Sequence, residues 1–97
     1  MPKLTPKQRA YLTSLAAKIK PFMQIGKKGL TEKSIEHIKD ALSANELVKI
    51  KILDTDTFSR EEIAKKIKEN TNAEIVRIIG KNIILYRPKK EPEIKLP

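Results

Sequence analysis

The spacing between apolar residues changes several times along the chain, and these changes limit the folds that it can adopt. After Thr5, apolar residues recur every three or four positions, which is typical of an amphipathic helix, until Pro21 forbids its continuation. Residues 22–25 are an apolar run that is too short for a helix, so we expect a strand there. A second helix is predicted from Thr31 to Asn45, because helical spacing returns and the Thr31 hydroxyl can cap the first turn.

The second half of the chain shows alternation, then helical spacing, then alternation again. Residues 47–53 alternate and predict a strand, and a third helix is predicted from Ser59, whose hydroxyl can cap it. Residues 75–79 and 83–87 are two strand-like runs separated by a short break that contains Gly80, which is the pattern of a β-hairpin. The predicted order is therefore α-β-α-β-α-β-β, an α/β or α+β arrangement.

One domain accounts for this order. The chain has 97 residues, which is enough for one domain and too few for two of ordinary size. We expect the domain to span residues 1–88 and to be followed by an irregular tail, residues 89–97, which has no hydrophobic period. Two aromatic residues, Phe22 and Phe58, lie where packing in the core is expected.

Missing residue types exclude several classes of protein. Without cysteine and with a single histidine, His37, the chain has no disulfide framework, thiolate metal site or histidine metal cluster. Asp54 and Asp56 lack the further ligands of a calcium loop. No apolar run approaches the length of a membrane span, and the N-terminus does not resemble a signal peptide. We therefore expect a cytoplasmic protein that is not an enzyme and needs no metal, cofactor or small-molecule substrate.

The charge of the chain predicts a polyanionic partner. Lysine and arginine total 21 against 12 acidic residues, which leaves a net charge of +9. Eight of these nine charges come from residues 1–20 and 80–97. If the two ends of the chain meet in space, they form one basic face. Nucleic acid is the first candidate for a ligand of such a face, and an anionic membrane surface is the second.

Two glycines bracket a pair of lysines in the sequence Gly26-Lys27-Lys28-Gly29, between a predicted strand and a predicted helix. Glycine lets a ligand approach the backbone closely, and the N-terminus of a helix favours an anion. KH domains clamp the nucleic-acid backbone with a GxxG loop of this kind. The alternative interpretation is an ordinary β-α turn with solvated lysines. The loop lacks the spacing of a nucleotide-hydrolysing P-loop, so a phosphodiester backbone fits it better than a mononucleotide.

Aromatic residues are few, which bears on how a nucleic acid would be recognised. Tyr11 and Tyr86 have polar tips and basic neighbours, so either could stack on a base. Packing at the edge of the core is the alternative for both. With four aromatic residues in all, the chain is expected to recognise backbone and shape rather than stacked bases.

The predicted order, the segment PFMQIGKKGLTEKSIEHIKDAL, the strand ELVKIKI and the closing IIGKNIILYRP together resemble the CRM domain, named for chloroplast RNA splicing and ribosome maturation. The resemblance runs from about Lys3 to Arg87. It implies a mixed four-stranded sheet with three helices, similar to the C-terminal domain of translation initiation factor three, and RNA binding through a KH-like GxxG loop. Stand-alone bacterial members, the YhbY-like proteins, associate with precursors of the large ribosomal subunit, whereas multidomain plant members assist group II intron splicing.

The candidate RNA-binding residues come from the loop, the basic residues along the edges of the first helix's apolar stripe, the strand lysines and the closing Tyr-Arg pair. They are Lys7, Arg9, Lys18, Lys20, Gly26, Lys27, Lys28, Gly29, Lys49, Lys51, Tyr86 and Arg87. The resemblance implies that the partner is ribosomal RNA of the large-subunit precursor, and we expect the protein to act as a monomer. The alternative is a basic module that docks an acidic protein, but lysine far outnumbers arginine, which favours solvated phosphates.

Overall fold

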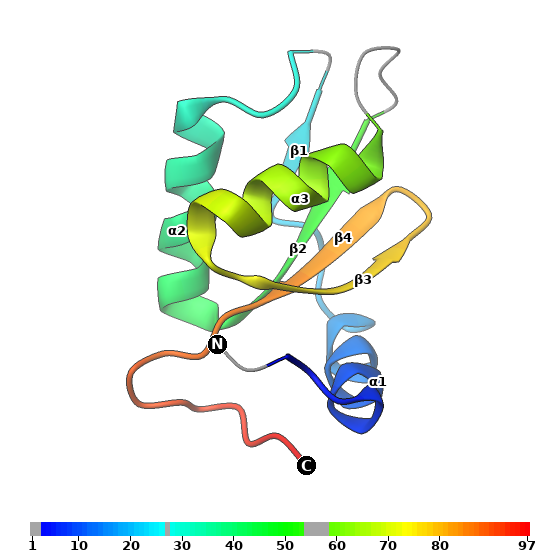
Figure 1. Ribbon diagram of the computed structural model, residues 1–97, viewed down its shortest axis with the longest axis vertical. Helices are drawn as coiled ribbons and strands as arrows, with labels where there is room; N and C mark the ends of the chain where they lie inside the picture. Colours follow the sequence, from blue (N-terminus) through cyan, green and yellow to red (C-terminus); the bar gives the residue numbers. More distant parts are fainter. Residues whose placement is uncertain (1–2, 27, 54–58) are drawn as a thin grey trace.

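The computed structural model describes residues 3–26, 28–53 and 59–97. It contains three helices and four strands in the predicted order (Figure 1). In chain order they are α1 (Pro6–Ala16), β1 (Met23–Ile25), α2 (Glu32–Asn45), β2 (Leu47–Ile52), α3 (Arg60–Thr71), β3 (Glu74–Ile79) and β4 (Asn82–Tyr86). The predicted α+β fold with a mixed four-stranded sheet is thereby confirmed. Lys27, Asp54, Asp56 and Phe58 lie outside the described residues.

The helix starts follow the capping signals in the sequence. Thr5 and Gln8 form a capping box, in which the Gln8 N–H donates to Thr5 Oγ1 (3.1 Å) and the Thr5 N–H donates to Gln8 Oε1 (3.0 Å). Thr31 and Ser59 cap α2 and α3 in the same manner, each accepting from the backbone N–H three residues later.

The strands lie in the order β1-β2-β4-β3. β1 and β2 are parallel and are connected through α2, which makes an ordinary β-α-β unit. β4 is antiparallel to both β2 and β3, so it lies between the strands that α3 connects. The predicted order also suggests a second β-α-β unit, made of β2, α3 and β3. In the structure β4, which is a strand of the closing hairpin, lies between β2 and β3. The hairpin connection is Gly80-Lys81, and Gly80 has a φ of 56°, a conformation that favours glycine.

Two helices cover one face of the sheet completely. α2 and α3 pack their apolar residues on the alternate residues of β2 and β4, with Ile38 and Leu42 from α2 and Ile63 and Ile67 from α3 all buried. No helix in the described part of the chain is long and apolar enough to cross a membrane.

The other face of the sheet is covered only in part. α1 buries Leu12 and Ala16 against Leu47, Ile84 and Tyr86 at one end of this face. At the other end no helix lies on the face, and its residues are exposed or half-buried. We call this end the open half of the sheet; its residues are Gln24, Lys49, Lys51, Arg77, Ile79 and Asn82.

α1 is shorter than the spacing of its apolar residues predicts. The helix ends at Ala16, and the next two N–H groups reach back only three residues, from Lys18 to Leu15 O (3.3 Å) and from Ile19 to Ala16 O (3.0 Å). Such tightened turns are common where a helix cannot continue, and here Pro21 follows. Lys18 and Lys20 consequently lie beyond the helix rather than along its sides.

The last ten residues contain no helix or strand, yet they are fixed to the domain. Ile94 and Leu96 pack on the cluster beneath α1. The buried carboxylate of Glu46 accepts hydrogen bonds from the backbone N–H groups of Glu93 (2.7 Å) and Ile94 (3.0 Å), with Lys89 N–H farther away at 3.5 Å. The tail is therefore docked through one acidic side chain.

Glu46 carries this role in an unusual backbone conformation. It follows the last turn of α2 with φ 64° and ψ −48°, where a side chain is strained and glycine would be easier. Burial alone would raise its pKa, but the backbone N–H donors of Glu93, Ile94 and Lys89, with the charge of Lys89, outweigh burial and lower the pKa below its ordinary value. The folded state thus favours the ionised carboxylate.

We predict that Glu46→Gln lowers the free energy of unfolding by about 2 kcal/mol, because hydrogen bonds to a charged acceptor contribute roughly 1.5–3 kcal/mol. Because the folded pKa is depressed, the stabilisation is fully present above the ordinary glutamate pKa of about 4.3 and is lost as pH falls through the lower folded value. Thermal unfolding against pH, with amide exchange at Glu93 and Ile94, measures both effects. Glu91→Gln, at an exposed position of the tail, is the control, and equal stability of the two variants would contradict the role of Glu46.

Candidate nucleic-acid interface

The Gly26–Gly29 segment connects β1 to α2 at one end of the sheet (Figure 1). The Gly29 N–H donates to Gly26 O (2.9 Å), so the segment closes as a four-residue turn. The Leu53 N–H donates to Ile25 O (2.9 Å) and fixes the start of the turn to the end of β2. Lys28 is exposed at this turn.

The two glycines serve different purposes. Gly29 is buried and has a φ of 71°, the left-handed conformation that residues with a Cβ avoid. Gly26 has no such φ, and among the described residues a Cβ built on it would meet only Leu53 Cδ1 at 3.9 Å, an ordinary contact. The fold therefore requires glycine at 29, whereas it leaves the absence of a side chain at 26 unexplained.

The N-terminus of α2 offers less to an anion than the sequence pattern indicates. The Thr31 side chain already accepts the Ser34 N–H (3.1 Å), so one of the free donors of the first turn is used. Glu32 places a carboxylate in that same turn, where it competes with an external anion for the helix dipole. A phosphate at this end of the molecule would therefore depend on Lys28 and the turn more than on the helix.

Strand lysines lead from α1 toward the turn. Lys49 and Lys51 alternate with the core residues of β2, so both lie on the face that α1 covers only in part. Lys51 of β2 lies opposite Gln24 of β1 in the register of the two strands, and the Phe22 N–H donates to Lys49 O (3.0 Å). At about 3.3 Å per residue, Lys49 lies about 13 Å along the strand from the level of Gly26.

We call Lys20, Lys49, Lys51 and Lys28 the lysine track. Lys20 is exposed next to Phe22, and Lys49 and Lys51 are half-buried on the sheet. In the described part of the chain, no acidic side chain forms an ion pair with any of these four lysines. Their charge is therefore available to a ligand.

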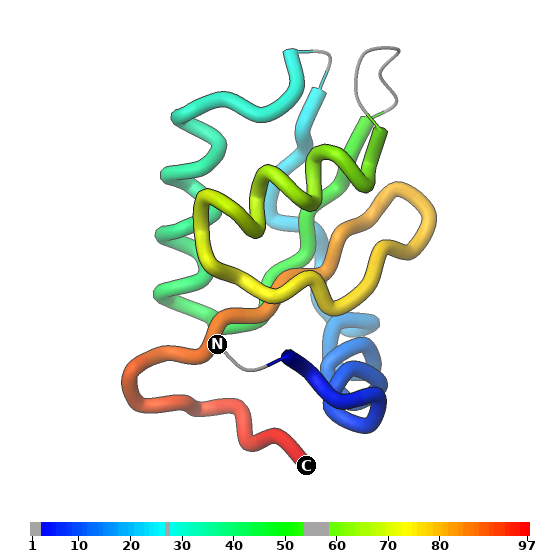
Figure 2. Tube along the Cα trace, in the orientation of Figure 1, coloured from blue at the N-terminus to red at the C-terminus, as the bar shows by residue number. Residues whose placement is uncertain are grey.

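The two ends of the chain lie together in space. This is the condition under which their charges form one basic face. Leu4 and Leu96 belong to one apolar cluster, and Gln8 Nε2 donates to Pro97 O (3.4 Å). Lys7 and Lys18 are exposed in this region. However, α1 and the C-terminal residues lie toward one end of the long axis, whereas the end of β1 and the start of α2, which flank the Gly26–Gly29 turn, lie toward the other (Figure 2). The basic face and the loop are thus two regions, which the lysine track bridges.

Tyr86 is not placed where it could stack on a base. Its side chain is 3% exposed and packs in the cluster beneath α1 with Leu47 and Ile84. Burial, together with the nearby Glu46 carboxylate, raises the pKa of the Tyr86 phenol. The assignment of Tyr86 to RNA contact is therefore corrected: the alternative, packing of an amphipathic ring, describes its place.

The two arginines of the candidate set hold the fold together. Arg9 is half-buried, and its Nη1 donates to Ile75 O (2.7 Å) and to Val76 O, which fixes α1 to β3. Arg87 donates from Nη1 to Thr71 O (2.8 Å) and from Nη2 to Lys39 O (3.2 Å), which joins the end of α3 to the middle of α2. Their donors are engaged by backbone carbonyls, a use that net charge cannot reveal.

Phe22 and Gln24 are surface residues that were not among the predicted site residues. Phe22 was expected in the core, but 43% of it is exposed, and Gln24 is exposed two residues later. Alternation around the buried Ile25 places Gln24 outward, and Phe22 shares its parity. That parity could have indicated an exposed aromatic residue beside the lysines.

The described residues include no group of three or more histidine, aspartate or glutamate side chains that could hold a metal ion. His37 is exposed on α2. The side chains of the open half carry lysine ammonium groups, one guanidinium group and amides, and the Phe22 ring lies next to them. These groups can bind a ligand, and among them there is no general acid or base with a partner.

Comparisons with known proteins agree with this geometry. The model of the CRS1 / YhbY (CRM) domain matches residues 4–87. An RNA-binding protein of Haemophilus influenzae is 37% identical over 97 residues, covering 100% of this chain and 98% of that protein. YqeI of Bacillus subtilis, named a probable RNA-binding protein, is 35% identical over 95 residues, covering 97% and 99%. The solution structure of the hypothetical protein SAV1595 from Staphylococcus aureus superimposes with a TM-score of 0.82 at 43% identity, covering 97% and 99%. The chain therefore belongs to the CRS1/YhbY (CRM) domain family.

Proposed function

We propose that this protein is a non-enzymatic RNA-binding protein that binds ribosomal RNA in precursors of the large ribosomal subunit. The observation that carries the proposal is the lysine track, which crosses the open half of the sheet toward the Gly26–Gly29 turn and has no acidic partner among the residues that the structure describes. A row of solvated ammonium groups suits the phosphates of an extended polyanion. Relatives that match the whole chain are named as RNA-binding proteins, which supports RNA as that polyanion.

The mechanism is electrostatic capture followed by close approach at the turn. Lysines attract phosphates at long range and make contacts that do not distinguish sequence. Gly26 is half-buried and has no side chain, so a phosphate can approach its backbone more closely than at a position with a side chain. Backbone and shape are therefore recognised first.

The ribosomal part of the proposal rests on the resemblance to stand-alone bacterial members and on the size of the Haemophilus influenzae and Bacillus subtilis relatives, 98% and 99% of whose length this chain matches. Assembly of ribosomes places the protein in the cytoplasm. We expect crosslinking in cells, followed by sequencing of the attached RNA, to recover large-subunit ribosomal RNA and its unprocessed flanks. Crosslinks mainly to other RNAs would overturn the ribosomal assignment, and crosslinks only to an acidic protein would favour the alternative of a protein-docking module.

We predict that the affinity for structured RNA falls steeply with salt. If about four phosphates are contacted, the slope of log K against log salt is near −3, because each contact contributes about −0.7 on a single strand. Lys28→Ala removes one contact, so its slope moves toward zero by about 0.7. Filter binding or fluorescence anisotropy over a range of salt concentrations measures both slopes.

The matched control is Lys65→Ala, which removes the same charge from an exposed position on α3. Its slope is expected to equal that of the unmodified protein. If Lys65→Ala and Lys28→Ala weaken binding equally, net charge alone explains the affinity and the turn has no special part in it.

We predict that substitution at the two glycines separates folding from binding. Gly26→Val leaves the domain folded but lowers RNA affinity about tenfold or more, because a side chain there holds a phosphate away from the turn and loses charge-assisted contacts of roughly 1.5–3 kcal/mol. Gly29→Val lowers stability by roughly 1–2 kcal/mol, because its φ of 71° strains any residue with a Cβ. Melting temperature and RNA affinity are measured for each variant in one buffer. Normal binding by folded Gly26→Val would remove the turn from the interface.

A further inference from the structure

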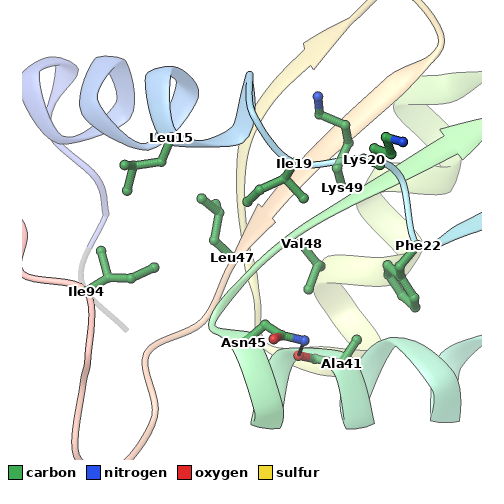
Figure 3. A pocket seen from close by; sticks show the side chains of 10 residues that line it. All are labelled: Leu15, Ile19, Lys20, Phe22, Ala41, Asn45, Leu47, Val48, Lys49 and Ile94. Atoms are coloured by element: carbon green, nitrogen blue, oxygen red, sulfur yellow. Dashed lines mark hydrogen bonds between the residues drawn. The ribbon is translucent and has the colours of Figure 1, made fainter.

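A hollow opens at the edge of the sheet between α1, α2 and the first residues of β2 (Figure 3). β1 pairs only with residues 50–52 of β2, so the earlier part of β2 has no strand beside it on that edge. The resulting cavity has a volume of about 510 Å³, within the range of about 300–1,000 Å³ that small-ligand sites occupy. Neither the charge pattern nor the family resemblance predicts it.

The hollow is apolar with a few polar groups at its border. Ile19 and Leu47 are among the aliphatic residues that line it, and Phe22 supplies its aromatic ring. Lys20 and Lys49 lie together at the border next to α1 (Figure 3). None of the lining residues is acidic.

Phe22 is held in place while its ring stays accessible. Its backbone N–H donates to Lys49 O (3.0 Å), and Pro21 before it restricts the chain. Its exposed fraction of 43% is high for a large aromatic side chain, which normally gains stability by burial. Asn45, on the α2 side of the hollow, donates to Ala41 O (3.2 Å), and its amide also carries a carbonyl oxygen that can accept a hydrogen bond.

These groups match one kind of ligand in particular. An unpaired nucleotide has a flat aromatic base, with faces that stack and edges that form hydrogen bonds, joined through a ribose to an anionic phosphate. Bases stack on exposed aromatic rings in single-stranded RNA, and lysines bind the adjoining phosphates. An aliphatic side chain of a protein partner would fill the apolar wall but would leave Lys20 and Lys49 without a counterion.

We propose that this hollow binds an unpaired RNA base, stacked on Phe22, with the phosphates beside it on Lys20 and Lys49. The proposal rests on the proposed function and deepens it. It makes the protein a reader of a bulged or looped nucleotide next to a helix, rather than of backbone and shape alone. The base lies at the α1 end of the lysine track, and the RNA chain then continues along the track toward the Gly26–Gly29 turn.

The first test compares three RNA hairpins that differ at one place in the stem: a bulged adenosine, an abasic bulge of the same length, and no bulge. We expect the unmodified protein to prefer the bulged adenosine about tenfold over the other two, in line with stacking on an aromatic side chain. Phe22→Leu is expected to lose that preference and to bind all three hairpins equally, whereas Phe22→Tyr is expected to retain it. Equal affinity of the unmodified protein for the three hairpins would overturn the proposal.

A second measurement keeps the test valid if Phe22→Leu is unstable. The chain contains no tryptophan, so Phe22→Trp introduces a single tryptophan, which can be excited selectively, into the hollow. We expect its emission to be quenched by the bulged-adenosine hairpin and not by the abasic one, because quenching needs a stacked base. His37→Trp, at an exposed position of α2, is the control and is expected to show no difference between the two hairpins. The same response at both sites would overturn the stacking proposal.

Failure of this inference is distinguishable from failure of the proposed function. If the hollow does not bind a base, Phe22→Leu leaves every affinity unchanged while Lys28→Ala still weakens binding and alters its salt dependence. If the protein is not an RNA-binding protein, none of the hairpins binds at all, with or without substitutions. A competing acidic peptide that displaces no RNA but quenches Phe22→Trp would instead assign the hollow to a protein partner.

Discussion

A four-stranded sheet has two faces, and three helices cannot cover both equally. Here α2 and α3 cover one face, and α1, which ends at Ala16, reaches only part of the other. A longer α1 would bury more of that second face and its apolar area would add stability. Because the helix stops short of Pro21, the side chains that alternate outward from β2 remain accessible, and the chain places lysines at these positions.

Arginine and lysine have separate tasks in this fold. Arg9, Arg60 and Arg87 each donate to backbone carbonyls of another element and thereby join helices to the sheet or to one another. The planar guanidinium, with its several fixed donors, suits such bridging. The lysine track, in contrast, has no acidic partner in the described residues. Net charge therefore does not distinguish arginines that bridge elements of the fold from lysines that have no acidic partner in the described residues.

Local signals along the chain predicted most of the fold. Caps such as Thr5 with Gln8, the change between helical and alternating spacing, and the Gly80 break depend on near neighbours in sequence, so they could be recognised without the tertiary structure. The insertion of β4 between β2 and β3 depends on pairing between distant segments, and no local pattern encodes it. The docking of the tail on Glu46 is of the same kind, since the carboxylate meets its partners 43–48 residues away.

The candidate site was predicted less completely than the fold. Residue type and alternation predicted the turn and the strand lysines as candidates. They did not predict whether each aromatic residue is buried or exposed. Tyr86 is buried because α1 lies over it. Phe22 is exposed because β1 is short, so no adjoining part of that strand covers its ring. Both outcomes depend on how far one element extends over another, which neither composition nor charge can specify.

The most direct test of the RNA interface is a titration of isotope-labelled protein with an RNA hairpin, followed through backbone amide NMR shifts. The account predicts shifts concentrated in residues 20–29, in Lys49 and Lys51 and at their neighbours on the open half of the sheet, with the outer surface of α3 unchanged. Shifts concentrated on α3 and the exposed side of α2, with the Gly26–Gly29 turn unaffected, would contradict it.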